Sequence, residues 1–118
     1  MNGSVTDPKV FGPGMWYTIH VSSMQMGEDC YIKYIKSLIP KIPCKKCRDH
    51  AMEYIQGNPI DNFTNIKDKD GELIGMFKWS WIFHNTVNQK LGKSIIDFNT
   101  AYNFYTNDSE LCTLNCGN

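Results

Sequence analysis

The chain has 118 residues, the length of one domain whose core is large enough to fold without metals or disulfides. Its 12 Lys and Arg side chains balance 12 Asp and Glu side chains, so no nucleic-acid partner is expected. No apolar run reaches the ~20 residues that cross a membrane. Residues 1–10 are polar and lack the features of a secretory signal. These features predict a single domain, 1–118, without a membrane span.

Hydrophobic periodicity predicts helices along most of the chain and scarcely any strands. Residues 11–14, Phe-Gly-Pro-Gly, are predicted to form a turn before the first helix, and Asp29 is expected to cap the second. The expected helices cover residues 15–26, 29–39, 43–56, 72–91 and 97–105. The sequence therefore predicts an all-α fold, with a four-helix bundle, a short fifth helix and a flexible C-terminal tail over residues 107–118.

Two cysteine pairs carry the strongest chemical signal. Cys44 and Cys47 stand at the start of the third predicted helix, and Cys112 and Cys116 stand close to the end of the chain. A helix N-terminus and flanking basic residues lower a thiol pKa, which favours redox chemistry at the first pair. A zinc site built from both pairs is the main alternative, and a passive thiol carrier is another. The remaining Cys30 is expected to be a small buried side chain.

Two histidine-containing faces suggest a binding site. Trp16 and His20 lie one turn apart on the first predicted helix, and His84 and Asn88 lie one turn apart on the fourth. Nearby aromatic side chains offer stacking surface, and two lysines that follow offer charge for a pyrophosphate. Such residues bind a flat cofactor in some proteins and simply pack in the core of others, so the pattern alone leaves both interpretations open.

Three motifs in order resemble the Erv/ALR family of FAD-linked sulfhydryl oxidases. They are W-x-x-x-H at residues 16–20, Cys-Lys-Lys-Cys at residues 44–47, and H-N-x-V-N-x-x-L-G-K at residues 84–93. Together with the cysteine pair on the tail they cover most of the chain. The small size resembles the viral branch, which is found in large DNA viruses that assemble in the cytoplasm. The resemblance implies a helical bundle that holds FAD within it.

The resemblance also implies roles for individual residues. Cys44 and Cys47 would be the catalytic pair, and Cys112 and Cys116 would form a shuttle disulfide; no metal is expected. The residues expected to contact FAD are Trp16, His20, Tyr54, His84, Asn85, Asn88, Lys90 and Lys93. Electrons would pass from a substrate dithiol to the shuttle pair, then through Cys44 and Cys47 to FAD, and finally to O2, giving H2O2.

The same resemblance implies partners and a place of action. The substrates would be thiol-containing proteins, and the chain would form a homodimer. It would work in the host cytoplasm, at viral assembly sites or packaged in the virion, because a chain that carries its own oxidant can form disulfides where thiols are otherwise kept reduced.

Two departures from the family pattern stand out. Pro13 follows Gly12 at a position where many relatives carry an Arg. Many relatives also carry a structural disulfide that brackets the H-N-x-V-N helix. This chain has Trp81 at the first of those positions and no cysteine near Phe98, where the second would lie. We therefore expect the end of the chain to be held by packing alone, or held loosely.

Overall fold

Helices dominate the computed structural model, which describes residues 6–106. The α-helices are α1 Pro8–Gln25, α2 Glu28–Leu38, α3 Lys45–Gly57, α4 Gly75–Lys90 and α5 Phe98–Thr106, with short 3-10 helices η1 Ile39–Lys41 and η2 Ile60–Phe63. Within residues 6–106, β pairing is limited to one isolated bridge between Lys67 and Leu73. The predicted all-α fold is confirmed. The predicted tail, with Cys112 and Cys116, lies outside the described residues.

The first helix starts well before the predicted position. Asp7 caps α1, because its carboxylate accepts a hydrogen bond of 2.9 Å from the Lys9 backbone N–H. Pro8 then occupies a first-turn position, where the N–H that proline lacks would have no helical partner anyway. Pro13 lies inside the helix. The turn predicted over residues 11–14 is therefore wrong, because a capped proline start outweighs the loss of one backbone hydrogen bond at Pro13.

Two further helix starts differ from prediction. Gly27 is the N-cap of α2, so Asp29 lies in the first turn, where its charge is favourable for the helix dipole. The helix α4 begins at Gly75 instead of Glu72. The backbone N–H of Glu72 donates to the Asp68 carboxylate at 3.0 Å, which keeps Glu72 in the preceding turn.

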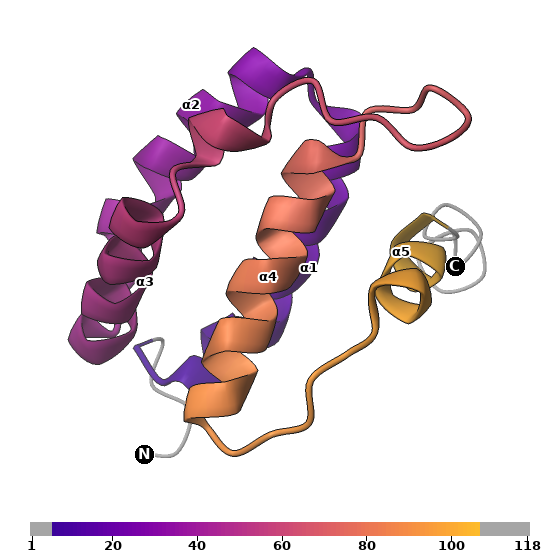
Figure 1. Cartoon of the computed structure of the whole chain (residues 1–118). Coiled ribbons are helices and arrows are strands. Elements are labelled where there is room, and N and C mark those ends of the chain that lie inside the picture. Colours follow the sequence, from indigo (N-terminus) through magenta and orange to yellow (C-terminus); the bar gives the residue numbers. More distant parts are fainter. Residues whose placement is uncertain (1–5, 107–118) are drawn as a thin grey trace, which may run out of the picture.

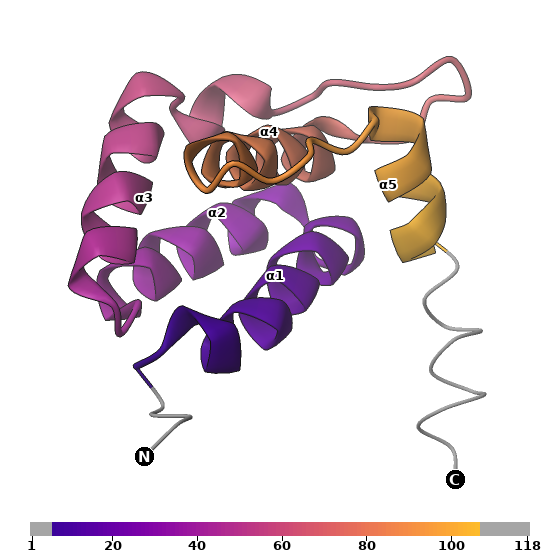
Figure 2. The same ribbon diagram turned by 90° about the horizontal axis from the view of Figure 1, so that it is seen from below.

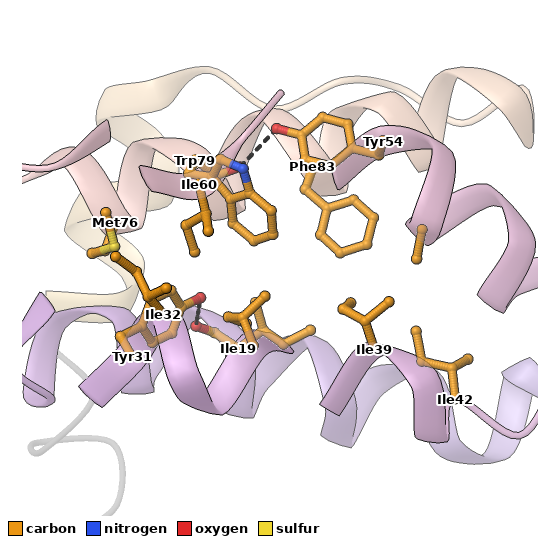
Figure 3. Packing of buried hydrophobic residues seen from close by; sticks show 12 residues of the cluster. Ile19, Tyr31, Ile32, Ile39, Ile42, Tyr54, Ile60, Met76, Trp79 and Phe83 are labelled. Carbon is orange, nitrogen blue, oxygen red and sulfur yellow. Dashed lines mark hydrogen bonds between the residues drawn. The ribbon is translucent and has the colours of Figure 1, made fainter. Parts of the chain in front are cut away.

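One hydrophobic core is shared by α1, α2, α3 and α4, and Figure 3 shows its packing. Its fully buried members come from both halves of the chain and include Ile19, Tyr31, Ile35, Ile39, Ile60, Trp79 and Phe83. Two buried tyrosines also join helices by hydrogen bonds. The Tyr31 hydroxyl donates to the Ile19 carbonyl at 2.8 Å, and the Tyr54 hydroxyl donates to the Trp79 carbonyl at 3.1 Å. The tyrosines therefore enter the core without an unpaired polar group.

The fifth helix stands beside the bundle instead of completing it. Figure 1 shows α1 and α4 side by side, with α2 and α3 on one flank and α5 on the other. An extended connection, residues 91–97, leads from α4 to α5. Figure 2 shows α3 and α5 at opposite sides of the molecule, and α5 packs against α1 and α4. No helix within residues 6–106 is both long enough and apolar enough to span a bilayer.

Candidate functional site

The Cys44–Cys47 pair lies at the N-terminus of α3. Cys44 is the N-cap residue, and its Sγ accepts a hydrogen bond of 3.3 Å from the Cys47 backbone N–H. The Cys47 thiol also donates to the Cys44 Sγ, with 2.6 Å between the two sulfur atoms. Both residues are half-buried thiols. This hydrogen bond helps to explain why α3 begins here, since the Cys44 sulfur pairs a backbone N–H that a helix start otherwise leaves unpaired.

The two thiols differ in acidity. The hydrogen bonds that Cys44 accepts from the Cys47 thiol and backbone N–H lower the pKa of Cys44. Burial raises the pKa of Cys47 to about 11, with further contributions from its hydrogen bond to Cys44 and from charge on Cys44. The first proton to leave the pair therefore comes from Cys44, which becomes the stronger nucleophile.

The basic residues around the pair contribute less than the sequence suggested. Lys46 lowers the pKa of both thiols. Lys45 instead forms an ion pair with Asp49, with 2.6 Å between Nζ and Oδ2. Arg48 donates to the Ile42 carbonyl at 2.6 Å and so ties the start of α3 to the preceding segment. Hydrogen bonds at the helix start, more than surrounding positive charge, set the acidity of Cys44.

A row of aromatic rings, which we call the ring row, leads from α3 across the bundle to α5. Its members in order are Tyr54, Phe83, Trp16, His84, His20 and Tyr105, with neighbouring centroids 4.7, 4.9, 4.0, 5.1 and 4.6 Å apart. Trp16 and His84 are nearly parallel, with an interplanar angle of 4°. The structure thus brings together Trp16, His20 and His84, which come from two helices and were predicted to share a site.

The two histidines at the centre of the ring row are hydrogen-bonded to each other. His20 Nε2 lies 2.8 Å from His84 Nδ1, and His20 Nδ1 lies 2.9 Å from the Ser80 hydroxyl. Burial, with the nearby His84, lowers the pKa of His20 to about 3. Burial, with the charge on Lys93, lowers the pKa of His84 to about 4. Both rings are therefore neutral at physiological pH.

A cavity of about 240 Å³ opens beside the ring row, between α4, α5 and the buried ring of His20 on α1. Its lining includes His20, Trp81, His84, Asn85, Phe104 and Tyr105. The volume lies below the usual range for a complete small-molecule site, so the cavity suits one part of a larger ligand. A second hollow, of about 300 Å³, lies between α1, α2 and η1 and is lined mainly by apolar groups such as Phe11, Met15 and Tyr34.

The connection between α4 and α5 is held by a cluster that we call the connection clamp: Trp81, Asn85, Ile96 and Phe98. The Asn85 amide donates to the Ile96 carbonyl and accepts from the Ile96 N–H, both at 2.9 Å. The Trp81 indole N–H donates to the same carbonyl at 2.7 Å, and its ring meets Phe98 edge-on at 5.3 Å. We expected the end of the chain to be held by packing alone, or held loosely. For these residues that expectation is wrong, because hydrogen bonds as well as packing hold the connection.

The other predicted site residues take varied positions. Tyr54 is buried in the core, and its contact with a cofactor stays a prediction. Asn88 is also buried, and its carbonyl accepts the Lys93 backbone N–H at 2.8 Å. Lys90 is the last residue of α4, the helix that carries His84, and Lys93 follows it at the start of the connection; both are exposed. They therefore bring positive charge close to the ring row.

Two residues correct or extend the sequence analysis. Cys30 is exposed, so the prediction that it is buried is wrong; it lies on the outer face of α2. Ser80 was not predicted, although its position one turn before His84 on α4 was a signal that it shares a face with that residue. Residues 6–106 contain no group of three or more His, Cys, Asp or Glu placed to hold a metal ion.

Comparison with known proteins gives a consistent result. The model of the Erv1 / Alr family matches residues 13–107. The FAD-linked sulfhydryl oxidase of African swine fever virus is 32% identical over 102 residues, which cover 80% of this chain and 79% of that protein. Two similar proteins also carry the words FAD-linked sulfhydryl oxidase in their names. They are 347L of Invertebrate iridescent virus 6 (30% identical; 80% and 91% covered) and 088R of Frog virus 3 (28% identical; 88% and 71% covered). The chain therefore belongs to the Erv1/Alr family.

Proposed function

We propose that this chain is a FAD-linked thiol oxidase that joins pairs of thiols in substrate proteins into disulfides. The observation that carries the proposal is the Cys44–Cys47 pair, in which one helix cap places two sulfur atoms 2.6 Å apart and separates their acidities. The names of the viral relatives agree with this chemistry. Bound FAD would accept the electron pair of a dithiol and reduce O2 to H2O2.

The residues around the ring row fit such a cofactor. Trp16 and His84 stack on each other with their centroids 4.0 Å apart, so a planar ring system would have to stack on an outer face of this pair. The lysines at the end of α4 supply the positive charge that a pyrophosphate requires. Trp16, His20, His84, Asn85, Asn88, Lys90 and Lys93 would hold FAD, with Tyr54 near the end of the ring row that lies on α3. The cavity beside α5 would receive one part of it.

The chemistry of the thiols follows from their positions. A dithiol attacks the oxidised Cys44–Cys47 pair at Cys44, forming a mixed disulfide while Cys47 leaves as a thiolate. In that mixed disulfide Cys44 carries no negative charge, and it no longer accepts a hydrogen bond from the Cys47 thiol. Two of the causes that raise the pKa of Cys47 are then gone, and only burial remains. Cys47 is therefore a better leaving group in the exchange step than the resting dithiol suggests.

The second thiol of the attacking dithiol completes the exchange. It attacks the first sulfur of the same dithiol, which is bonded to Cys44 in the mixed disulfide. Cys44 is released as a thiolate, and the two attacking sulfurs are joined in a disulfide, a two-electron oxidation of that pair. In our proposal the attacking dithiol is Cys112–Cys116, which has itself been reduced by a substrate protein. These two residues lie outside the described part of the chain, so their role rests on the family pattern and on their spacing.

The partners and the place of action are proposed on the same basis. From the family resemblance we propose a viral protein that acts in the host cytoplasm, at assembly sites or within the virion; the relatives named above agree only with a viral source. A homodimer is proposed from the family resemblance, and the apolar hollow between α1, α2 and η1 offers surface for such a contact. The substrates would be viral proteins with paired cysteines.

The visible absorption spectrum of the purified chain tests the function. We expect a yellow protein whose flavin band is bleached by a dithiol without air and recovers when O2 is admitted. Cys47→Ser should stay yellow but lose turnover with every thiol. Cys116→Ser should keep turnover with dithiothreitol and lose it with protein substrates. A colourless chain whose fold is lost on adding a chelator would overturn the proposal in favour of a structural zinc module.

A further inference from the structure

A buried chain of hydrogen bonds leads from the backbone of α4 to the candidate cofactor site. The Ser80 hydroxyl lies 2.7 Å from the Phe77 carbonyl oxygen and 2.9 Å from His20 Nδ1. His20 Nε2 then lies 2.8 Å from His84 Nδ1. Ser80 is fully buried and His20 is 2% exposed, so these groups bond to one another.

The first hydrogen bond has only one possible direction. Two oxygen atoms 2.7 Å apart repel each other unless a proton lies between them, and a carbonyl has none to give. The Ser80 hydroxyl must therefore donate to the Phe77 carbonyl. Tyr31 also interacts with Ser80, but its own hydroxyl proton goes to the Ile19 carbonyl, so the Tyr31 oxygen can only share the Ser80 proton as a second acceptor and cannot donate to Ser80. Ser80 consequently offers His20 a lone pair.

That direction fixes the histidines in turn. Because Ser80 accepts, His20 Nδ1 must carry a proton and donate it. A neutral imidazole has one N–H, so His20 Nε2 is unprotonated and accepts from His84 Nδ1–H. His84 has then used its only N–H, and its Nε2 is left as an acceptor. The lowered pKa of each ring, caused mainly by burial, agrees with two neutral imidazoles.

We propose that Ser80 and His20 are positioning residues that hold His84 in the tautomer whose Nε2 accepts a hydrogen bond from the bound cofactor. This inference rests on the proposed function. His84 lines the cavity, so the group it binds there must be an N–H or O–H donor, such as an adenine amino group, a ribose hydroxyl or a flavin imide. A phosphate oxygen cannot fill this role, because it only accepts. Contacts to the pyrophosphate therefore fall to the lysines at the end of α4.

Histidine tautomers can be read directly in the full chain labelled with 15N-histidine. Long-range 1H–15N correlation spectra should show His20 and His84 both protonated at Nδ1 and unprotonated at Nε2, in the absence as in the presence of FAD. A proton on His84 Nε2 in the wild-type chain would overturn the inference. Because this measurement needs no cofactor, it gives an answer even if the chain proves not to bind FAD, which would instead overturn the proposed function.

Three variants test whether the tautomer matters for binding. Ser80→Ala should give His84 a mixture of tautomers and raise the Kd for FAD about tenfold, the effect of one lost hydrogen bond. Ser80→Thr, which restores the hydroxyl, should keep the Kd within about twofold of the wild type. Ser23→Ala is the matched control, because it removes another buried hydroxyl that donates to the backbone carbonyl of His20 and not to its ring.

The outcomes separate a tautomer effect from general damage. Equal losses of FAD affinity in Ser80→Ala and Ser23→Ala, or no loss in Ser80→Ala, would contradict the positioning role. Titration with FMN locates the donor group on the cofactor. If Ser80→Ala weakens FAD and FMN by the same factor, the donor lies on the flavin half; if it weakens FAD alone, the donor lies on the adenosine half. If Ser80→Ala fails to fold, the wild-type spectra still decide.

Discussion

Breaking the connection clamp should release α5 without unfolding the bundle. Asn85→Ala removes both hydrogen bonds between the Asn85 side chain and the Ile96 backbone. Each contributes about 0.5–1.5 kcal/mol net, and Ile96 is 41% exposed, so water replaces part of what is lost. We expect the free energy of opening to fall by about 1–2 kcal/mol, which raises the open population about 5- to 30-fold.

Native-state hydrogen exchange measures this opening, and the Ala101 amide is a suitable probe. It is bonded to the Asp97 carbonyl at 3.0 Å and belongs to the one residue of α5 that is buried. Asn85→Ala should speed its exchange by the factor given above and leave the amide of Trp79, in the core, unchanged. Trp81→Phe should have a smaller effect, because it removes one donor to a carbonyl that Asn85 still binds.

Thr86→Ala is the matched control for the clamp. The Thr86 hydroxyl donates to the Ile82 carbonyl within α4 and not to the connection. In Thr86→Ala the hydrogen-exchange rate of the Ala101 amide should match that of the wild type. If Asn85→Ala left Ala101 unchanged, or accelerated every helix equally, α5 would not be a separately held element and the reasoning would be wrong. The experiment is run with and without FAD, because Asn85 is also a predicted cofactor contact.

Two further predictions concern stability. The pKa values of His20 and His84 are lowered from 6.5 to about 3 and about 4, so the unfolded chain binds protons that the native chain does not. Stability should therefore be complete above pH 6.5 and fall as the pH drops toward 4; a urea midpoint that stays constant over this range would show that the rings are not held neutral. Gly75→Ala should destabilise the chain by about 1–3 kcal/mol or more in urea unfolding, because the added Cβ would lie only 1.8 Å from the Phe63 carbonyl oxygen. Gly14→Ala, in a helix and with open space around it, should instead stabilise by up to about 1 kcal/mol, and equal effects of both changes would contradict this account.

Local signals explain what the sequence could predict. The periodic apolar positions in residues 29–39 predict Ile32, Ile35, Leu38 and Ile39 as core residues; three are buried, and Leu38 is partly buried against the core. Spacing placed Trp16 and His20 on one helix face, and the family resemblance implied that His84 shares a site with them; the three rings do meet. Helix periodicity decides which side chains share a face within one helix, but it does not decide which helices meet.

Contacts between distant segments explain what the sequence could not predict. The clamp joins residues 81 and 85 to residue 96 through a backbone carbonyl, which has no signature in the sequence. Ser80 is one of several serines, and its hydrogen bond to a histidine depends on the position of His20 on another helix. Cys30 is exposed because its position on α2 turns it away from the core, whereas a composition argument expects a lone thiol to be buried.

The aromatic and amide contacts around Ile96 have a consequence for how the protein matures. All three cysteines within residues 6–106 are thiols, and the connection between α4 and α5 is held by contacts of Trp81 with Phe98 and Ile96. A chain built this way can reach its native shape in a reducing compartment before any sulfur has been oxidised. An oxidase that required a disulfide for its own architecture would depend on the product it makes, and residues 6–106 avoid that circularity.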